Sequence, residues 1–210
     1  ALHEAEMTLA DGAGIVVAVR LLCSQTIERV TGVDVVEALF ASSAEVTPRI
    51  FLLGNAASID ELQGRYPTRV VGRWGSGTAE PCHDGESIAR IRERHATVVL
   101  VGYGAPGQVL WIERNRQALA DAGVRLVIGV GGALDYASGT VERAPRIVRR
   151  LGLEWCYRLL QEPWRWRRQL ALPKFVAMVM RAWASSLLRG ECRACRILSH
   201  DDESNCNHIP

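Results

Sequence analysis

The feature that most constrains the fold is a series of short apolar runs, each of which ends near a glycine-rich turn. The clearest is residues 97–101, which read TVVLV and lead directly into Gly102. Continuous apolar runs of this length are typical of strands that are covered on both faces of a parallel sheet. Three more predicted strands have the same character, at residues 49–53, 69–72 and 124–130.

Segments with helical character separate these runs. We expect helices at residues 15–22, 35–44, 58–66, 86–94 and 109–122, the first packed on the sheet and the second capped by Asp34. The alternation predicts an α/β fold, Rossmann-like and doubly wound around a mostly parallel sheet. Ligands bind such folds at the carboxyl ends of the strands. We expect four loops at that edge: residues 11–14, 54–55, 102–108 and 131–135.

The pattern changes after Val130. Residues 141–151 and 153–160 predict two short helices broken at Gly152, and Pro163 favours the start of a third. We therefore expect a Rossmann-like core at residues 1–150, a helical appendage at residues 151–190 and a tail without regular structure at residues 191–210. A glycine loop such as that around Asp11 normally follows a strand, so we expect the first strands of the core to precede Ala1.

Positive charge is concentrated in the last third of the chain. Residues 141–196 contain twelve arginines and Lys174 against four acidic residues, a local net charge of +9, while the remaining residues sum to −7. This asymmetry predicts an anionic partner, and arginine matches phosphate oxygens in pairs. Trp164 and Trp166 alternate with arginines, which favours a membrane–water interface. A solvated helix with its tryptophans in the core is the alternative.

Several common chemistries lack their motifs in this chain. Residues 129–135 do not match the GxGxxG dinucleotide fingerprint, and no acidic residue follows on a second strand at the usual distance. There is no phosphate loop with lysine, no evident Ser–His–Asp set and no Asp-x-Asp in the predicted core. The tail contains residues of the types that bind zinc, but their spacing matches no standard finger: Cys192, Cys195, His200, Cys206 and His208. No nucleic-acid recognition motif accompanies the basic region. Lone carboxylates in the loops, with many arginines, fit a metal-free transfer. One Asp would be the general base, and arginines with backbone N–H groups would stabilise a leaving diphosphate.

Six ordered motifs then carry a specific resemblance over about residues 9–175. They are residues 10–12 (ADG), 29–34 (RVTGVD), 101–108 (VGYGAPGQ), 129–135 (GVGGALD), 143–145 (RAP) and 152–163 (GLEWCYRLLQEP). Their order resembles that of the WecG/TagA/CpsF glycosyltransferases, glycosyltransferase family 26.

The resemblance implies an inverting, metal-independent and cofactor-free enzyme. It would move an N-acetylmannosamine-type sugar or a related hexose from a UDP-sugar to a polyprenyl-diphosphate-linked sugar, for cell-surface polysaccharide or teichoic acid linkage synthesis. It also implies a cytoplasmic protein held peripherally on the inner face of the plasma membrane, with no nucleic-acid partner. Family members can associate through the core, which leaves a homo-oligomer open.

The resemblance also assigns site residues. Asp11 matches the proposed catalytic base and Gln108 the active-site glutamine, although Asp11 could instead cap a helix and Gln108 could be a solvated first-turn residue. The matching motifs place the substrate-binding residues at Gly104, Gly131, Gly132, Asp135, Arg143, Arg158, Arg165 and Arg168. The last three belong to an appendage thought to close over the site and touch the membrane.

Two positions depart from the family pattern. Val109 stands where the family usually has Glu, and Gly107 stands where it has Lys. Val109, together with the first strands that we expect to precede Ala1, supports an alternative function, a catalytically inactive, membrane-associated scaffold that binds a nucleotide sugar.

Overall fold

The computed structural model describes residues 5–42, 47–163, 166 and 170–189. Its internal contacts divide the chain into two compact units. The first unit comprises Ala1–Thr8 and Val30–Arg143, and the second comprises Leu9–Arg29 and Ala144–Pro210.

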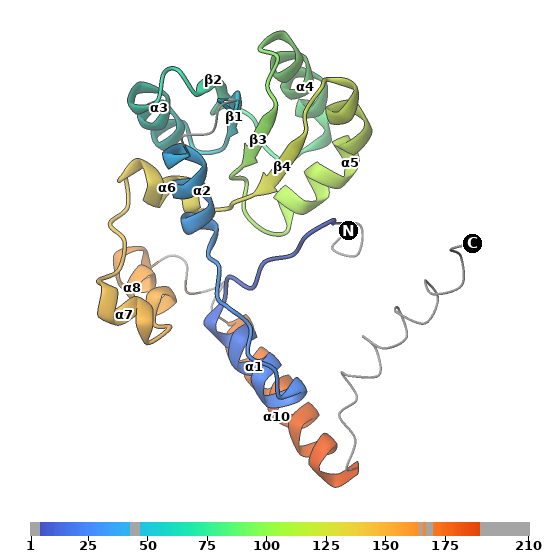
Figure 1. The fold of residues 1–210 in the computed structure, drawn as a ribbon, viewed down its shortest axis with the longest axis vertical. Coiled ribbons are helices and arrows are strands. Elements are labelled where there is room, and N and C mark those ends of the chain that lie inside the picture. The colour runs from blue at the N-terminus through green and yellow to red at the C-terminus, as the bar shows by residue number, and fades with distance from the viewer. Residues whose placement is uncertain (1–4, 43–46, 164–165, 167–169, 190–210) are drawn as a thin grey trace, which may run out of the picture. The chain divides into compact units, whose positions relative to one another are not determined.

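The first unit is organised around a four-stranded parallel sheet. Its strands are β1 (Ile50–Leu53), β2 (Val70–Trp74), β3 (Val98–Val101) and β4 (Leu126–Gly129), in the order β2-β1-β3-β4 (Figure 1). The register pairs Leu53 with Val101 and Val101 with Gly129, so three strands end level with one another. The predicted α/β class and parallel sheet are confirmed.

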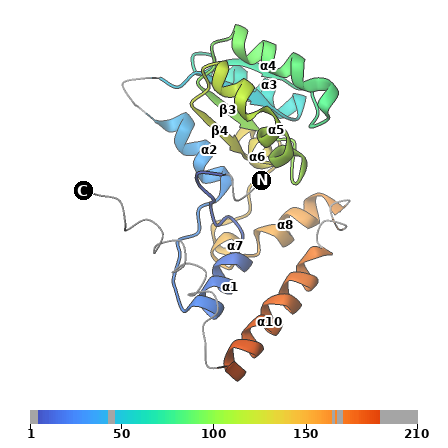
Figure 2. The same ribbon diagram turned by 90° about the vertical axis from the view of Figure 1, so that its right-hand side faces the viewer.

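Helices cover both faces of this sheet, as the doubly wound prediction requires. One face packs against α2 (Gly32–Ala41), α3 (Ala56–Arg65) and α6 (Ala133–Ser138), with Val36, Ile59 and Leu134 in the core between them. The other face packs against α4 (Asp84–Glu93), which follows the short 3-10 turn η2 (Pro81–His83), and against α5 (Gly107–Asp121). There Trp111 is fully buried. Figure 2 shows the sheet from the side of α5.

The prediction that the last strand is buried is wrong. β4 pairs with β3 on one side and with no strand on its other side among the described residues. As an edge strand it is only partly covered, and Leu126 is 42% exposed. Its apolar sequence resembled a central strand because its side chains still pack against the cores on the two faces of the sheet. Ile128 packs against the core under α2, α3 and α6, and Val127 packs against the core under α4 and α5.

The predicted cap of α2 is also corrected. The helix begins at Gly32, three residues before the expected start, and Thr31 is its N-cap. The hydroxyl of Thr31 accepts a hydrogen bond from the backbone N–H of Asp34, and the Asp34 carboxylate accepts one from the backbone N–H of Thr31. Asp34 is therefore the third residue of a capping box, which satisfies two helix-end donors at once.

All the regular elements in the described part of the second unit are helices. It contains α1 (Ala13–Cys23), α7 (Arg146–Arg150), α8 (Glu154–Gln161) and α10 (Ala171–Arg189). The helix after Asp11 was expected to pack on the sheet, but α1 packs against α10 (Figures 1 and 2). Gly14 of α1 lies beside the ring of Phe175. Gly152 separates α7 from α8, as predicted, with a φ of +71° that favours glycine.

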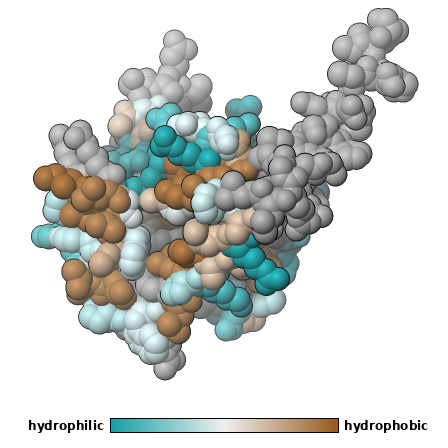
Figure 3. Space-filling model, turned by 90° about the horizontal axis from the view of Figure 1, so that it is seen from below, coloured by the Kyte–Doolittle hydropathy of each residue, from teal (hydrophilic) through white to brown (hydrophobic). Residues whose placement is uncertain are grey.

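Apolar side chains are exposed on this helical unit. Figure 3 shows hydrophobic patches between hydrophilic ones on one side of the molecule. The exposed apolar residues of α1 and α10 are Ile15, Val17, Leu21, Val176, Met178 and Met180. No helix in the described ranges combines the length and apolarity that crossing a membrane requires. Most of the segment expected to start a helix at Pro163, and the whole predicted tail with Cys192 and Cys195, lie outside the described residues.

Candidate active site

The winding of the chain changes direction between β1 and β3. β1 leads into α3 on one face of the sheet, whereas β3 leads into α5 on the other face. In open α/β sheets, ligands bind outside the carboxyl ends of the strands at such a switch point. The loops that follow β1, β3 and β4 therefore form the candidate site of the first unit.

Gly102 lies at the switch point, and the backbone packs closely around it. Its N–H donates a hydrogen bond of 2.6 Å to the carbonyl oxygen of Leu53. A β-carbon on Gly102 would lie 2.9 Å from Leu134 Cδ1, 3.1 Å from the Leu53 oxygen and 3.2 Å from the Gly131 oxygen. Only glycine fits there without moving the loops apart.

Gln108 joins two of these loops. Its side chain extends from the first turn of α5, and its Oε1 accepts a hydrogen bond of 3.2 Å from the N–H of Gly104. A β-carbon on Gly129 would lie 2.9 Å from Gln108 Nε2, and one on Gly131 would lie 3.6 Å from Oε1. The structure thus brings together three predicted site residues, Gly104, Gln108 and Gly131, around one amide.

Asp135 is held at the start of the next helix. Gly132 is the N-cap of α6, and Asp135 lies in its first turn. The hydroxyl of Ser58, on α3, donates a hydrogen bond of 2.8 Å to Asp135 Oδ1. Because Ser58 is completely buried, this hydrogen bond holds the Asp135 carboxylate from the interior of the unit.

An aromatic segment borders the loop after β3. The ring of Tyr103 packs edge-on against that of Trp111, with ring centroids 6.0 Å apart. A β-carbon on Gly77 would lie 2.8 Å from the Tyr103 hydroxyl and 2.6 Å from the Trp74 ring. Burial, with a smaller effect from the charge of Asp84, raises the pKa of Tyr103 well above its usual value. The phenol therefore stays neutral and packs beneath the segment around Gly77.

Arg143 is engaged by carboxylates of its own unit. Its guanidinium lies 2.6 Å from Asp34 Oδ1 and 3.2 Å from both carboxylate oxygens of Glu37. Burial alone would raise the pKa of Asp34, but hydrogen bonds from Thr31 and Arg143 outweigh it, so this pKa lies below its usual value. The predicted substrate contact of Arg143 stays a prediction, whereas its contacts in the structure join α2 to the end of the unit.

Asp11 belongs to the second unit, two residues before α1. Its carbonyl oxygen accepts a hydrogen bond of 2.7 Å from Nε of Arg29. Gly12, rather than Asp11, occupies the N-cap position of α1, and no side-chain cap hydrogen bond is made there. Asp11 therefore precedes the N-cap position that the alternative assigned to it, and its predicted role as a base stays a prediction.

Of the three predicted arginines of the appendage, the structure describes Arg158 alone. Arg158, on α8, donates through Nε to Glu162 Oε2 at 2.8 Å, and both side chains are largely buried. Arg165 and Arg168 lie outside the described residues.

Comparison with known proteins identifies the family. Residues 1–188 match the family described as "Glycosyl transferase WecG/TagA/CpsF family". The chain belongs to the WecG/TagA/CpsF family of glycosyltransferases. It is also similar to the N-acetylglucosaminyldiphosphoundecaprenol N-acetyl-beta-D-mannosaminyltransferases of Bacillus subtilis and Bacillus spizizenii. The identities are 32% and 31% over 186 residues, which cover 86% of this chain and 70% of each relative.

The sequence of this WecG/TagA/CpsF chain did not predict two residues that contact predicted site residues or motifs, Ser58 and Arg29. Ser58 contacts Asp135 across 77 positions, and Arg29 contacts Glu154 across 125. Arg29 begins one of the family motifs, and this was the one signal that could have singled it out. Ser58 had no signal beyond its place in the first turn of a helix that follows a strand.

No cluster of three or more His, Cys, Asp or Glu side chains suited to a metal occurs in the part of the chain that the structure describes. The three cysteines of that part, Cys23, Cys82 and Cys156, form no disulfide with one another.

Proposed function

We propose that this glycosyltransferase moves an N-acetylmannosamine-type sugar or a related hexose from a UDP-sugar to a polyprenyl-diphosphate-linked sugar, with inversion and without a metal. The two relatives carry the proposal most directly. Their shared name describes transfer of an N-acetyl-beta-D-mannosaminyl group to N-acetylglucosaminyldiphosphoundecaprenol. A β product from an α-linked UDP-sugar requires inversion.

In the proposed reaction, Asp11 is the general base. Its carboxylate takes the proton from a hydroxyl of the acceptor sugar as that oxygen bonds to the anomeric carbon of the donor. The bond between the anomeric carbon and the diphosphate oxygen breaks on the opposite face, and UDP leaves with the electron pair. One displacement of this kind converts an α-linked donor into a β-linked product.

The developing charge on UDP needs stabilisation that does not depend on a metal. α5 begins at Gly107 with no acidic residue in its first turn, so the positive end of its helix dipole supports a role near phosphate. Arg158, Arg165 and Arg168 are the proposed cationic partners. Gln108, held against Gly104, is the proposed sugar or acceptor contact.

The acceptor's polyprenyl chain places the proposed reaction at a membrane surface. The exposed apolar residues of α1 and α10, together with the arginines of residues 141–196, support peripheral contact with the inner face of the plasma membrane. Apolar side chains would enter the headgroup region while arginines contact lipid phosphates.

The role of Asp11 is tested by replacing it with an isosteric amide. We expect Asp11→Asn to lower transfer by about a hundredfold or more, since it removes the base, while binding of UDP-sugar measured by calorimetry is retained. Asp60→Asn is the matched control, because Asp60 is an exposed carboxylate of α3 that pairs with Arg73. Full transfer by Asp11→Asn would refute the assignment of the base.

The alternative of an inactive scaffold rests on Val109, the residue after Gln108, because the family usually has Glu at this position. UDP release in the presence of a lipid-diphosphate acceptor distinguishes the two functions, because a scaffold would bind the donor without turnover. The same assay with EDTA tests metal independence, since loss of turnover on chelation would exclude it.

A further inference from the structure

Arg29 connects the loop of Asp11 to the C-terminal helices of its own unit. Its guanidinium makes three contacts in three directions. Nε donates to the Asp11 carbonyl oxygen at 2.7 Å, one terminal nitrogen lies 3.3 Å from the carbonyl oxygen of Arg149, and the other lies 3.0 Å from Glu154 Oε2. A single side chain therefore links residue 11 with residues 149 and 154, all within the second unit.

A second contact joins the same two segments independently. Gly152, in the turn between α7 and α8, has a φ of +71°, and a β-carbon there would lie 2.6 Å from Ala13 Cβ. Ala13 is the first residue of α1, two positions after Asp11. The backbone around Asp11 is thus fixed by the Arg29 side chain and by direct packing of the α7–α8 turn.

The contacts of Arg29 with the Arg149 carbonyl and with Glu154 are partly sheltered from water, whereas its contact with the Asp11 carbonyl is exposed. The side chains of Arg29 and Glu154 are only 26% and 13% exposed. Charged hydrogen bonds in such surroundings are stronger than those at an open surface, and removal of one partner leaves the other without its counter-charge. Exposed pairs such as Arg73 with Asp60 lack this shelter, with side chains 40% and 51% exposed.

We propose that Arg29 is a positioning residue of the transferase, which sets the backbone of Asp11 for proton abstraction and is itself held by Glu154. This inference rests on the proposed role of Asp11 as the base. Arg29 acts through the Asp11 carbonyl and touches no reacting atom in this account. When a reacting group is held slightly out of place, the rate of the chemical step falls even though the substrates still bind. Arg29 variants should therefore change kcat more than KM.

The first test compares Arg29→Gln with wild type, with turnover expressed per UDP-binding site so that unfolded protein is not counted. We expect kcat to fall about tenfold or more, as for loss of a charge-assisted contact that orients a reacting group. KM for the UDP-sugar and its binding affinity should stay within about twofold. Unchanged kcat, or equal changes in kcat and affinity, would overturn the proposal.

Exchange of the two charges separates positioning from simple stabilisation. The double variant Arg29→Glu with Glu154→Arg keeps an ion pair but removes the donor to the Asp11 carbonyl. We expect its melting temperature to recover relative to Arg29→Glu alone, while kcat per site stays low. Recovery of kcat would show that the ion pair suffices and would overturn the role of the Asp11 contact.

Glu154→Gln keeps the proposal testable if the exchanged variant does not fold. It preserves side-chain shape and removes only the charge that holds Arg29. We expect it to lower kcat, and the combination with Arg29→Gln to be no worse than Arg29→Gln alone, because both act through one guanidinium. Multiplicative losses would contradict a shared route.

Arg49→Gln is the matched control. Arg49 also donates to two backbone carbonyl oxygens, those of Arg94 and His95. It precedes β1, at the amino ends of the strands, whereas the candidate site lies at their carboxyl ends. It should lower the melting temperature without changing kcat per site.

Asp11→Asn is measured in parallel. Full activity of Asp11→Asn would refute the base itself, whereas an inactive Asp11→Asn beside a fully active Arg29→Gln would refute only the positioning role.

Discussion

The buried hydroxyl of Ser58 donates a hydrogen bond of 2.8 Å to the carboxylate of Asp135. Ser58 is on α3, which follows β1, and Asp135 is on α6, which follows β4. The contact therefore ties together two helices on the same face of the sheet, beside the switch point. Asp135 is the predicted nucleotide-side carboxylate, so Ser58 would determine how it meets the donor.

Ser58→Ala should weaken UDP-sugar binding. The variant removes a hydrogen bond to a charged group, worth about 1.5–3 kcal/mol in general, so an affinity loss of about tenfold is expected. Isothermal calorimetry with the UDP-sugar measures it. Ser87→Ala is the control, because Ser87 is equally buried and donates at 2.8 Å to the Asp84 carbonyl oxygen within α4. Equal affinities for the two variants would contradict the prediction.

Arg143→Gln should destabilise the protein in a pH-dependent manner. The pKa of Asp34 is lowered in the folded state, partly by Arg143, so this stabilisation is present above the unfolded pKa of about 3.9 and is lost as pH falls through the lower folded value. We expect a loss of about 1 kcal/mol at pH 7, since the Asp34 side chain is half exposed. Denaturant unfolding at several pH values measures the difference, which should shrink toward zero in strong acid. A penalty independent of pH would argue that packing, rather than charge, is responsible.

Gly102→Ala should be strongly destabilising. The added methyl would lie 2.9 Å from Leu134 Cδ1 and 3.1 Å from a backbone oxygen, and overpacking of this kind costs about 1–3 kcal/mol. Gly64→Ala is the matched control on α3, where nothing lies within 4 Å, and it should stabilise by about 0.5–1 kcal/mol. Thermal unfolding compares the two. Similar melting temperatures for Gly102→Ala and Gly64→Ala would show that the loops at the switch point can move apart to accommodate a methyl group at little cost in stability.

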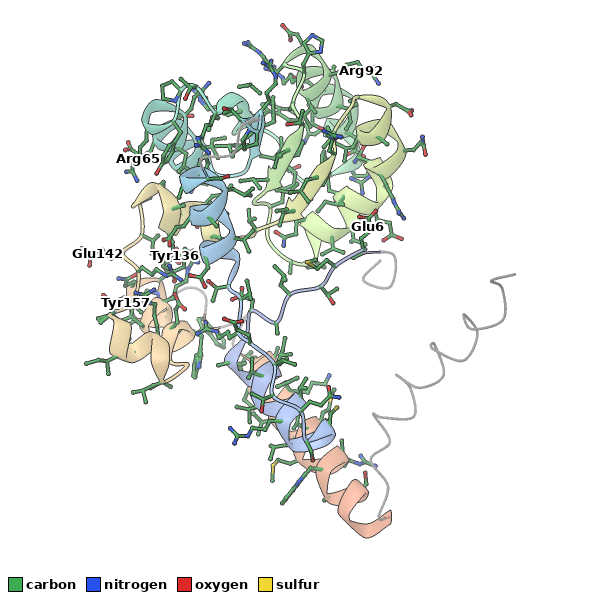
Figure 4. All side chains as sticks on the ribbon, in the orientation of Figure 1. Glu6, Arg65, Arg92, Tyr136, Glu142 and Tyr157 are labelled. Atoms are coloured by element: carbon green, nitrogen blue, oxygen red, sulfur yellow. The ribbon has the colours of Figure 1, made fainter. Side chains whose placement is uncertain are left out.

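Replacement of both Arg165 and Arg168 by Ala should impair handling of the diphosphate. Two lost charge-assisted contacts at about 1.5–3 kcal/mol each predict a fall in kcat/KM on the order of a hundredfold or more. The paired variant Arg92→Ala with Arg125→Ala removes two exposed arginines of the first unit, one of them labelled in Figure 4, and controls for total charge. A loss below about threefold would indicate that Arg165 and Arg168 do not contact substrate.

The regular elements could be predicted from sequence because local patterns specify them. The apolar runs that became β1 and β3, and the break at Gly152, depend on neighbouring residues alone. α6 was missed because six residues between Gly132 and Gly139 are too few to show helical periodicity. The cap of α2 was misplaced because Thr31 and Asp34 are both good caps, and only their mutual hydrogen bonds decide between them.

The contacts that organise the candidate site could not be predicted in the same way. Ser58 with Asp135, and Arg29 with Glu154, join residues far apart in sequence. Arg65 illustrates the same limit, since this residue of α3, labelled in Figure 4, donates to the carbonyl oxygens of Ala137 and Ser138 on α6. Single polar residues of this kind carry no local pattern, because their partners are chosen by the tertiary fold.

The measurement that tests the central claim most directly is turnover of defined substrates. The protein is incubated with UDP-N-acetylmannosamine and N-acetylglucosamine linked to a short polyprenyl diphosphate, with EDTA present. Mass spectrometry detects the lipid-linked disaccharide, and NMR assigns the new anomeric centre. The account predicts a β-linked product formed in the presence of EDTA. The absence of product from a panel of UDP-sugars, an α-linked product, or activity that requires added metal would contradict it.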